Sequence, residues 1–162
     1  MKGYLVKVWC PFPIKKTLTN SHINYLTSIG VTNLQKPPDA NGKDLWSDAV
    51  FGNNQKRKVD NKLISLFLKK FHCNKGKVIS IDVPTGLCPD QGEPFLENAV
   101  KANYTLAIGL NKIGLTQDSA LPFIGELNHI DIGIPNNMLS EIETKILNCL
   151  LYTSPSPRDS SP

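Results

Sequence analysis

The stretch that decides the fold is Val78-Ile79-Ser80-Ile81-Asp82-Val83-Pro84-Thr85-Gly86-Leu87, an apolar run that ends in a polar turn. The run is typical of a buried strand, and Pro84 and Gly86 are residues that turn the backbone. Asp82 is therefore expected just past a strand end, where open α/β sheets bind their ligands. A plain strand end with a solvated turn is the simpler interpretation, and this segment alone does not separate the two.

Strands and helices are expected to alternate along the rest of the chain. Strands are predicted at residues 4–9, 31–34, 45–51, 77–83, 103–110 and 127–132, and helices from Thr19 or Asn20, from Asp60 and from Ser140. Strands that alternate with helices of about ten residues indicate βαβ units and a parallel sheet, so we expect an α/β protein. Strand 77–83 is apolar almost throughout, as expected for a strand buried on both faces.

The composition and net charge exclude several classes of protein. The 162 residues are 40% hydrophobic and 20% charged, which suits one folded domain rather than a disordered chain. The net charge is a mild +4, and no long basic stripe with interleaved aromatic residues occurs, so no nucleic-acid partner is expected. No apolar run reaches the ~20 residues of a membrane span. The four cysteines lack zinc-ligand spacing and are expected to be free thiols of a cytoplasmic protein.

Three loops that follow predicted strands carry polar residues. The first runs from Asp48 through Gly52 to the basic residues 56–58, which can meet phosphates or simply be solvated before a helix. The second is 82–86, and the third contains Lys112, which can reach an anion. All three are expected at the carboxyl ends of strands, the edge of an open sheet that binds ligands.

The first two of these loops carry the residues with the clearest chemistry. About one βαβ unit separates Asp48 from Asp82, and consecutive strands of such a unit are often neighbours. We therefore expect Asp48, Asp82 and Thr85 to lie together. Two carboxylates and a hydroxyl can hold a hard cation, or the two acids can share proton transfer, and the sequence leaves both uses open.

These segments resemble the NAD(P)H-hydrate epimerase family, also called the YjeF N-terminal domain. The matching stretches are residues 47–52, 81–87 with Asp90, Gly92 and Glu93, 112–115, 125–127 and 131–135. The resemblance implies a Rossmann-like three-layer α/β/α sandwich with a mostly parallel sheet. It also implies an isomerase that interconverts the R and S forms of hydrated NADH or NADPH. Such an enzyme serves nicotinamide nucleotide repair with an ADP- or ATP-dependent dehydratase, fused or separate, and is often a homodimer.

The resemblance also assigns roles to individual residues. Asp82 matches a substrate-binding acid, which we expect to be the catalytic residue. Asp48 and Thr85 match two ligands of the potassium ion that family members bind. The substrate-contacting loop of the family corresponds to Gly52, Asn53, Asn54, Gln55, Lys56, Arg57 and Lys58.

The chain departs from the family in ways that bear on its activity. The Gly-rich phosphate-binding segment of the family, which belongs upstream of residue 1, has no counterpart, and Asn53 and Asn54 stand where bacterial members often have Thr-Gly. We therefore expect residues 1–151 to form a partial domain that is poorly stable and inactive as written. The departures also leave open a non-catalytic module of the same fold, used for binding or dimerisation, and an unrelated doubly wound protein.

The last residues differ in kind from the rest. Residues 152–162 hold four serines and three prolines and almost nothing apolar, so we expect them to be disordered. They also look like a translated sequencing adapter. The expected domain therefore ends at residue 151, and the tail is treated as non-native.

Overall fold

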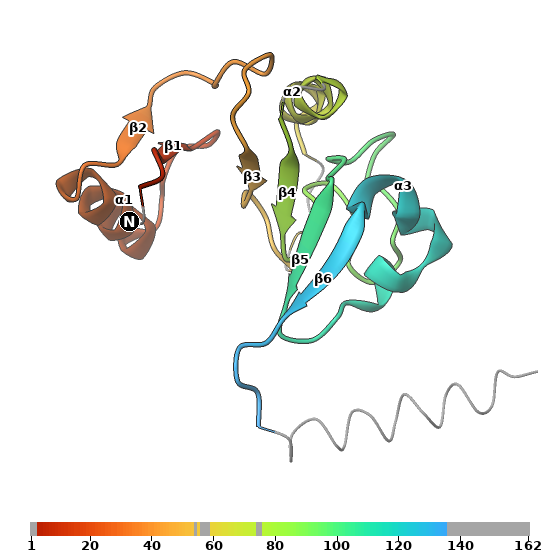
Figure 1. Ribbon diagram of the computed structural model, residues 1–162. Helices are drawn as coiled ribbons and strands as arrows, with labels where there is room; N and C mark the ends of the chain where they lie inside the picture. Colours follow the sequence, from red (N-terminus) through yellow and green to blue (C-terminus); the bar gives the residue numbers. More distant parts are fainter. Residues whose placement is uncertain (1–2, 54, 56–58, 74–75, 136–162) are drawn as a thin grey trace, which may run out of the picture.

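The structure is a computed structural model that describes residues 3–53, 55, 59–73 and 76–135 (Figure 1). The elements in chain order are β1 (Lys7–Trp9), α1 (Thr17–Ser28), β2 (Thr32–Leu34), β3 (Trp46–Asp48), α2 (Asn61–His72), β4 (Val78–Ile81), β5 (Tyr104–Ile108), the 3-10 helices η1 (Ile113–Thr116) and η2 (Asp118–Ala120), α3 (Leu121–Ile124) and β6 (Glu126–Ile130). The helix expected from Ser140 and the tail 152–162 lie outside the described residues.

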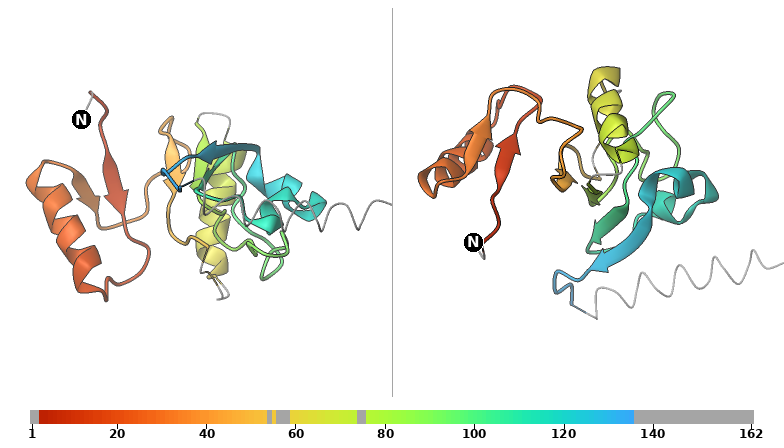
Figure 2. Two further views of the ribbon diagram at one scale, coloured as in Figure 1. Left: turned by 90° about the horizontal axis from the view of Figure 1, so that it is seen from below. Right: turned by 45° about the horizontal axis from the view of Figure 1, so that its top comes forward.

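The strands form two parallel sheets. β1 pairs with β2, and the main sheet has the order β3-β4-β5-β6, with each strand parallel to its neighbour. Figure 2 shows that β1, α1 and β2 lie beside the main sheet. The prediction of an α/β fold with a parallel sheet is confirmed. None of the described helices is both long and apolar enough to cross a bilayer.

The first helix begins earlier than the sequence suggested. α1 starts at Thr17 after Lys16, and the backbone N–H of Asn20 already donates to the Lys16 carbonyl at 3.1 Å. The prediction of a cap at Thr19 or Asn20 is therefore wrong, because both residues already lie within the first turn. The predicted stop is right, since Gly30 follows the helix with φ of 86°. α1 has no buried residue and contributes little to the main core.

Helix α2 supplies the larger core. Asp60 caps it by accepting a hydrogen bond from the Lys62 amide at 2.9 Å, as predicted. Three residues of its apolar face, Leu63, Ile64 and Phe67, are buried in one cluster with Trp46 of β3 and Val78 of β4. The rings of Trp46 and Phe67 meet edge to face at 5.5 Å between centroids.

The two faces of the main sheet differ in burial. The buried side chains of one face are Trp46, Asp48, Val78, Ser80, Thr105 and Ala107. α2 and the segment from η1 to α3 pack on this face through two hydrophobic clusters. On the opposite face Ile79 and Ile81 are only half-buried and Ile108 is exposed. The prediction that β4 is buried on both faces is wrong for the described residues, because the described helices of the main sheet pack on one face.

Candidate active site

The two acids singled out in the sequence lie at the same edge of the main sheet. β3 and β4 are parallel, and Asp48, the last residue of β3, is in register with Ser80 of β4. Asp82 follows the last residue of β4 directly. Because parallel strands end at one edge, both acids stand at the carboxyl ends of neighbouring strands, as expected. The loop that carries Lys112 follows β5, the next strand along.

Asp48 is completely buried and its carboxylate is enclosed by hydrogen-bond donors. Thr85 donates from its backbone N–H to Oδ2 at 2.8 Å and from its hydroxyl to Oδ1 at 2.7 Å. The Ser80 hydroxyl donates to Oδ2 at 3.2 Å, and the Val50 amide lies 3.5 Å from Oδ1. Burial raises the pKa of the Asp48 carboxyl, and the hydrogen bonds from Thr85 partly oppose this rise.

The contact between the Val50 amide and Asp48 lies just beyond the end of β3. The sequence suggested a strand over 45–51, whereas β3 ends at Asp48. Beyond that residue the backbone turns toward the carboxylate of Asp48, so Val50 is no longer part of the ladder.

A tight turn presents Thr85 to Asp48. The Leu87 amide donates to the Pro84 carbonyl at 3.0 Å, and Gly86, the third residue of the turn, has φ of 93°. A Cβ at Gly86 would also lie 3.3 Å from the Cα of Ala99, so this position requires glycine for both space and conformation. The Val100 amide donates to the Thr85 carbonyl at 2.9 Å. Thr85 is therefore fixed on both its backbone and its side chain.

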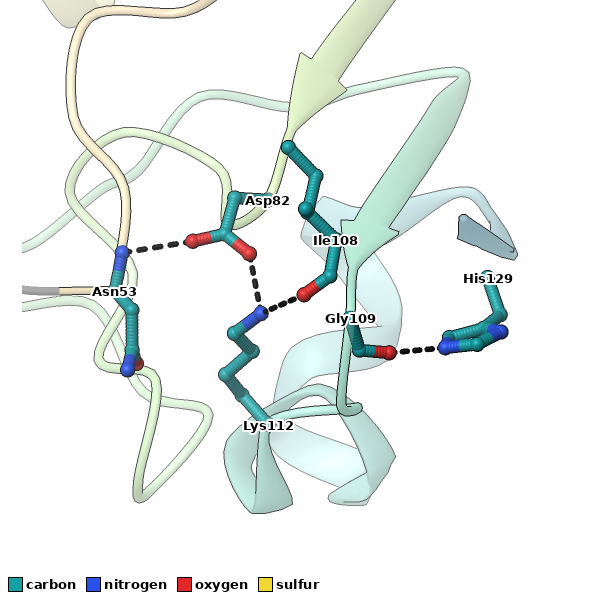
Figure 3. Close-up of polar contacts among 6 residues, drawn as sticks. All are labelled: Asn53, Asp82, Ile108, Gly109, Lys112 and His129. Atoms are coloured by element: carbon teal, nitrogen blue, oxygen red, sulfur yellow. Dashed lines mark hydrogen bonds and ion pairs between the residues drawn. The ribbon is translucent and has the colours of Figure 1, made fainter. Parts of the chain in front are cut away.

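Asp82 is held between two loops (Figure 3), and its side chain is partly open to solvent. Its Oδ2 accepts a hydrogen bond from the Asn53 backbone amide at 2.9 Å, and its Oδ1 forms an ion pair with Lys112 Nζ. The ammonium group of Lys112 also donates to the Ile108 carbonyl at 2.8 Å. The side chains of Asp82 and Lys112 are 16% and 13% exposed, so a ligand in front of the sheet edge can reach this pair.

The backbone around Asp82 shows why small or permissive residues surround it. Asp82 itself has φ of 72°, in the left-handed region that few non-glycine residues occupy. A Cβ on Gly52 would lie 3.1 Å from Oδ2 of Asp82. The backbone at Gly52 therefore approaches the Asp82 carboxylate closely.

The remaining residues of the expected substrate loop divide into three groups. Asn53 contacts Asp82 through its backbone and is itself exposed. Gln55 is buried, and its side-chain amide hydrogen bonds to backbone atoms of the 84–87 turn rather than facing solvent. The other expected members, Asn54, Lys56, Arg57 and Lys58, lie outside the described residues.

Lys112, expected from its place after a strand to reach an anion, pairs instead with Asp82, and two further residues near the site, Ser80 and His129, were not predicted. Ser80 is signalled by a hydroxyl inside an otherwise apolar strand. His129 of β6 had no such signal. Its Nε2 contacts the Gly109 carbonyl, which can only accept, so this ring nitrogen is the donor (Figure 3).

The surroundings of Asp48 suit a hard cation in their chemistry. Its neighbours Ser80 and Thr85 supply hydroxyl oxygens, and such cations prefer oxygen ligands. Among the residues that the structure describes, no basic side chain pairs with Asp48, so its charge lacks a counterion there. The same residues contain no group of three or more His, Cys, Asp or Glu side chains that could hold a metal ion. Asp48 and Thr85 can therefore be two ligands of a cation but not a complete set.

Comparison with known proteins identifies the family. The sequence family described as YjeF-related protein N-terminus matches residues 1–114, which is most of the chain. The chain belongs to this family. The resemblance found in residues 47–52 and 81–87 is thereby confirmed.

Two relatives of this YjeF N-terminal chain are longer than the chain itself. The chain is 35% identical over 132 residues to the bifunctional NAD(P)H-hydrate repair enzyme Nnr of Gloeobacter violaceus. The aligned residues cover 81% of this chain and 26% of that protein. It is 33% identical over 87 residues to the NAD(P)H-hydrate epimerase of Lentilactobacillus buchneri, covering 54% of this chain and 40% of that one. The chain thus spans about a quarter of the bifunctional relative.

A solved structure supports the fold. The crystal structure of the yeast protein ynu0 matches with a TM-score of 0.66 and covers 86% of this chain and 60% of that chain. The sequence identity is 19%, so the likeness concerns the fold alone. It agrees with the Rossmann-like α/β fold that the family resemblance implied.

Proposed function

We propose that this YjeF N-terminal chain belongs to an enzyme that interconverts the R and S forms of hydrated NADH and NADPH. The observation that carries the proposal is the placement of Asp82. Its carboxylate stands at the carboxyl edge of a parallel sheet, is oriented by Asn53 and Lys112, and stays accessible. The names of the relatives support the same activity, since they are an NAD(P)H-hydrate epimerase and a bifunctional NAD(P)H-hydrate repair enzyme.

The proposed reaction needs one group that handles a proton and stabilises positive charge. The hydroxyl at C6 of the hydrated nicotinamide ring leaves as water after it gains a proton, and the ring becomes an iminium-like cation. Water then returns to either face and gives up a proton. Asp82 in its protonated form gives the proton to the leaving hydroxyl, its resulting carboxylate stabilises the cation, and this carboxylate takes a proton back from the returning water. Lys112 and the Asn53 amide keep the carboxylate in place between the two steps.

We also propose that Asp48 and Thr85 are ligands of a potassium ion. The support is the oxygen chemistry of the pair and the complete burial of Asp48 without a basic partner among the described residues. A cation beside Asp48 would offset the lost hydration of its charge. Potassium has a low charge density, so its role here is to hold the turn rather than to act as a Lewis acid.

The structure weakens one reason for the alternative of a non-catalytic module. That alternative drew on Asn53 and Asn54, which replace the Thr-Gly frequent in bacterial members. Asn53 reaches Asp82 through its backbone N–H, which every residue except proline supplies. Its side chain is therefore not needed for this contact, and the catalytic proposal is the better supported one.

We further propose, from the family resemblance alone, that the substrate is hydrated NADH or NADPH, that the dehydratase is fused or separate, and that the protein can form a homodimer in the cytoplasm. The bifunctional Nnr relatives are consistent with a fused repair partner.

The activity is tested in the natural full-length protein that carries this sequence. The R form of NADPH hydrate is incubated with the protein, and formation of the S form is followed by chromatography. Asp82→Asn should lower the rate roughly a hundredfold or more, since general acid-base groups typically contribute that much. Asp118→Asn, which neutralises an exposed acid of η2, is the matched control and should keep the rate. A normal rate for Asp82→Asn would show that Asp82 does not carry the reaction.

A further inference from the structure

Gln55 is a buried polar side chain whose hydrogen bonds all reach one turn. It is 5% exposed, although it lies in a loop of polar residues. Its Nε2 donates to the Pro84 carbonyl at 3.0 Å and to the Leu87 carbonyl at 2.8 Å. Its Oε1 accepts from the Gly86 amide at 2.9 Å. Both donor hydrogens and the acceptor oxygen of the amide are therefore used, and all three partners are backbone atoms.

The loop that carries Gln55 also reaches the other end of the same segment. Two residues earlier, the Asn53 amide donates to Asp82. The loop after β3 thus binds Asp82 at the start of the turn segment and the backbone of 84–87 at its end. Thr85, whose hydroxyl and amide hold Asp48, lies within the 84–87 turn that Gln55 binds.

We propose that Gln55 is a positioning residue, which fixes the 84–87 turn so that Asp82 and Thr85 keep the geometry of the site. The inference rests on the proposed function for its catalytic consequence, but not for the contact itself. It replaces the expectation from the family resemblance that Gln55 touches the substrate, because a side chain with no free polar atom has nothing to offer a ligand.

The chemistry of the site selects an amide at this position. Leucine has a similar size, but it would leave two carbonyls and one N–H of the turn without this partner. Glutamate keeps an acceptor for the Gly86 amide, but when ionised it offers no hydrogen to either carbonyl. Both substitutions therefore loosen the turn, and neither changes the residues that contact Asp82 or Asp48 directly.

The contact is tested first by hydrogen exchange in the full natural chain. In the wild type the Gly86 amide should exchange about as slowly as the amides of β4. Gln55→Leu should speed its exchange by about tenfold or more, while the β4 amides stay slow. Gln35→Leu, at an exposed glutamine, is the matched control and should change neither. Rapid exchange of Gly86 in the wild type, or unchanged exchange in Gln55→Leu, would overturn the proposal.

The catalytic consequence is tested by steady-state kinetics. A positioning role predicts that Gln55→Glu lowers kcat about tenfold or more while KM stays within about twofold. A rise in KM with kcat preserved would show that Gln55 binds the substrate and would contradict the inference. If the wild type itself lacks epimerase activity, the proposed function fails, whereas hydrogen exchange still decides whether Gln55 holds the turn. If either variant does not fold, the hydrogen-exchange rate of the Gly86 amide in the wild type still decides whether Gln55 holds the turn.

Discussion

Thr85 holds both oxygens of the Asp48 carboxylate, with its amide 2.8 Å from Oδ2 and its hydroxyl 2.7 Å from Oδ1. Asp48 ends β3, and Thr85 belongs to the turn after β4. One residue therefore ties the end of a strand to the turn of its neighbour inside the core. Burial is the first cause of the raised pKa of Asp48, and no second acid is among its causes.

Removal of the Thr85 hydroxyl should destabilise the fold. Thr85→Val keeps the shape and the amide but leaves Oδ1 of a buried carboxylate without its nearest donor. We expect the free energy of unfolding to fall by about 1–3 kcal/mol, measured by chemical denaturation. Thr85→Ser keeps a hydroxyl and should cost much less. The control Thr32→Val changes an exposed threonine of β2 and should have little effect. Equal stability of Thr85→Val and the wild type would contradict the account.

The buried Asp48 should make stability depend on pH with a definite sign. Burial raises the pKa of this carboxyl above 3.8, so the folded protein binds the proton more tightly than the unfolded chain. The contribution of Asp48 to stability is therefore full below 3.8 and is lost as the pH rises through the raised value. The free energy of unfolding of the wild type minus that of Asp48→Asn should therefore fall as the pH rises from 3.8 through the raised pKa. Above the raised pKa this difference should stay constant. A difference that grows with pH would show that the pKa is not raised.

Potassium should act on the same group. If the ion binds ionised Asp48, added potassium should raise the melting temperature increasingly as the pH rises and the carboxyl becomes ionised. Tetramethylammonium at equal ionic strength is the control for screening, because it is too large for a buried site. Asp48→Asn should remove the difference between the two salts. Equal effects of both cations on the wild type would exclude a specific potassium site at Asp48.

The left-handed backbone of Asp82 should appear in a comparison of two variants. Asp82→Ala and Asp82→Gly both lose the ion pair with Lys112 and the acceptor of the Asn53 amide. They differ in that alanine keeps the strain of φ at 72° and glycine relieves it. We expect Asp82→Gly to be more stable than Asp82→Ala by about 1 kcal/mol in chemical denaturation. The opposite order would mean that the backbone relaxes on substitution.

Local patterns allowed the elements and much of the site to be predicted from sequence. The Asp60 cap, the turn at Pro84 and Gly86, and the shared edge of Asp48, Asp82 and Thr85 each follow from short stretches and from the rule that parallel strands end together. The start of α1 was missed because Thr19 and Asn20 also suit a cap, and propensity does not decide between nearby starts.

The features that could not be predicted depend on contacts between distant parts of the chain. Gln55 lies among polar loop residues, and its burial becomes visible only when the 84–87 turn is in place. The pairing of Lys112 with Asp82 likewise depends on how β4 and β5 align. Burial of β4 on both faces was wrongly predicted. An apolar run shows that burial of its side chains is favourable, but it does not show which element covers each face.

The most direct test of the central claim follows the oxygen that Asp82 is proposed to serve. The R form of NADPH hydrate is incubated with the full natural protein in water labelled with heavy oxygen, and the S form is analysed by mass spectrometry. The account predicts rapid formation of S hydrate that carries the label at C6, and loss of that rapid labelling in Asp82→Asn. Rapid labelling by Asp82→Asn, or wild-type epimerisation that retains the original oxygen, would contradict it.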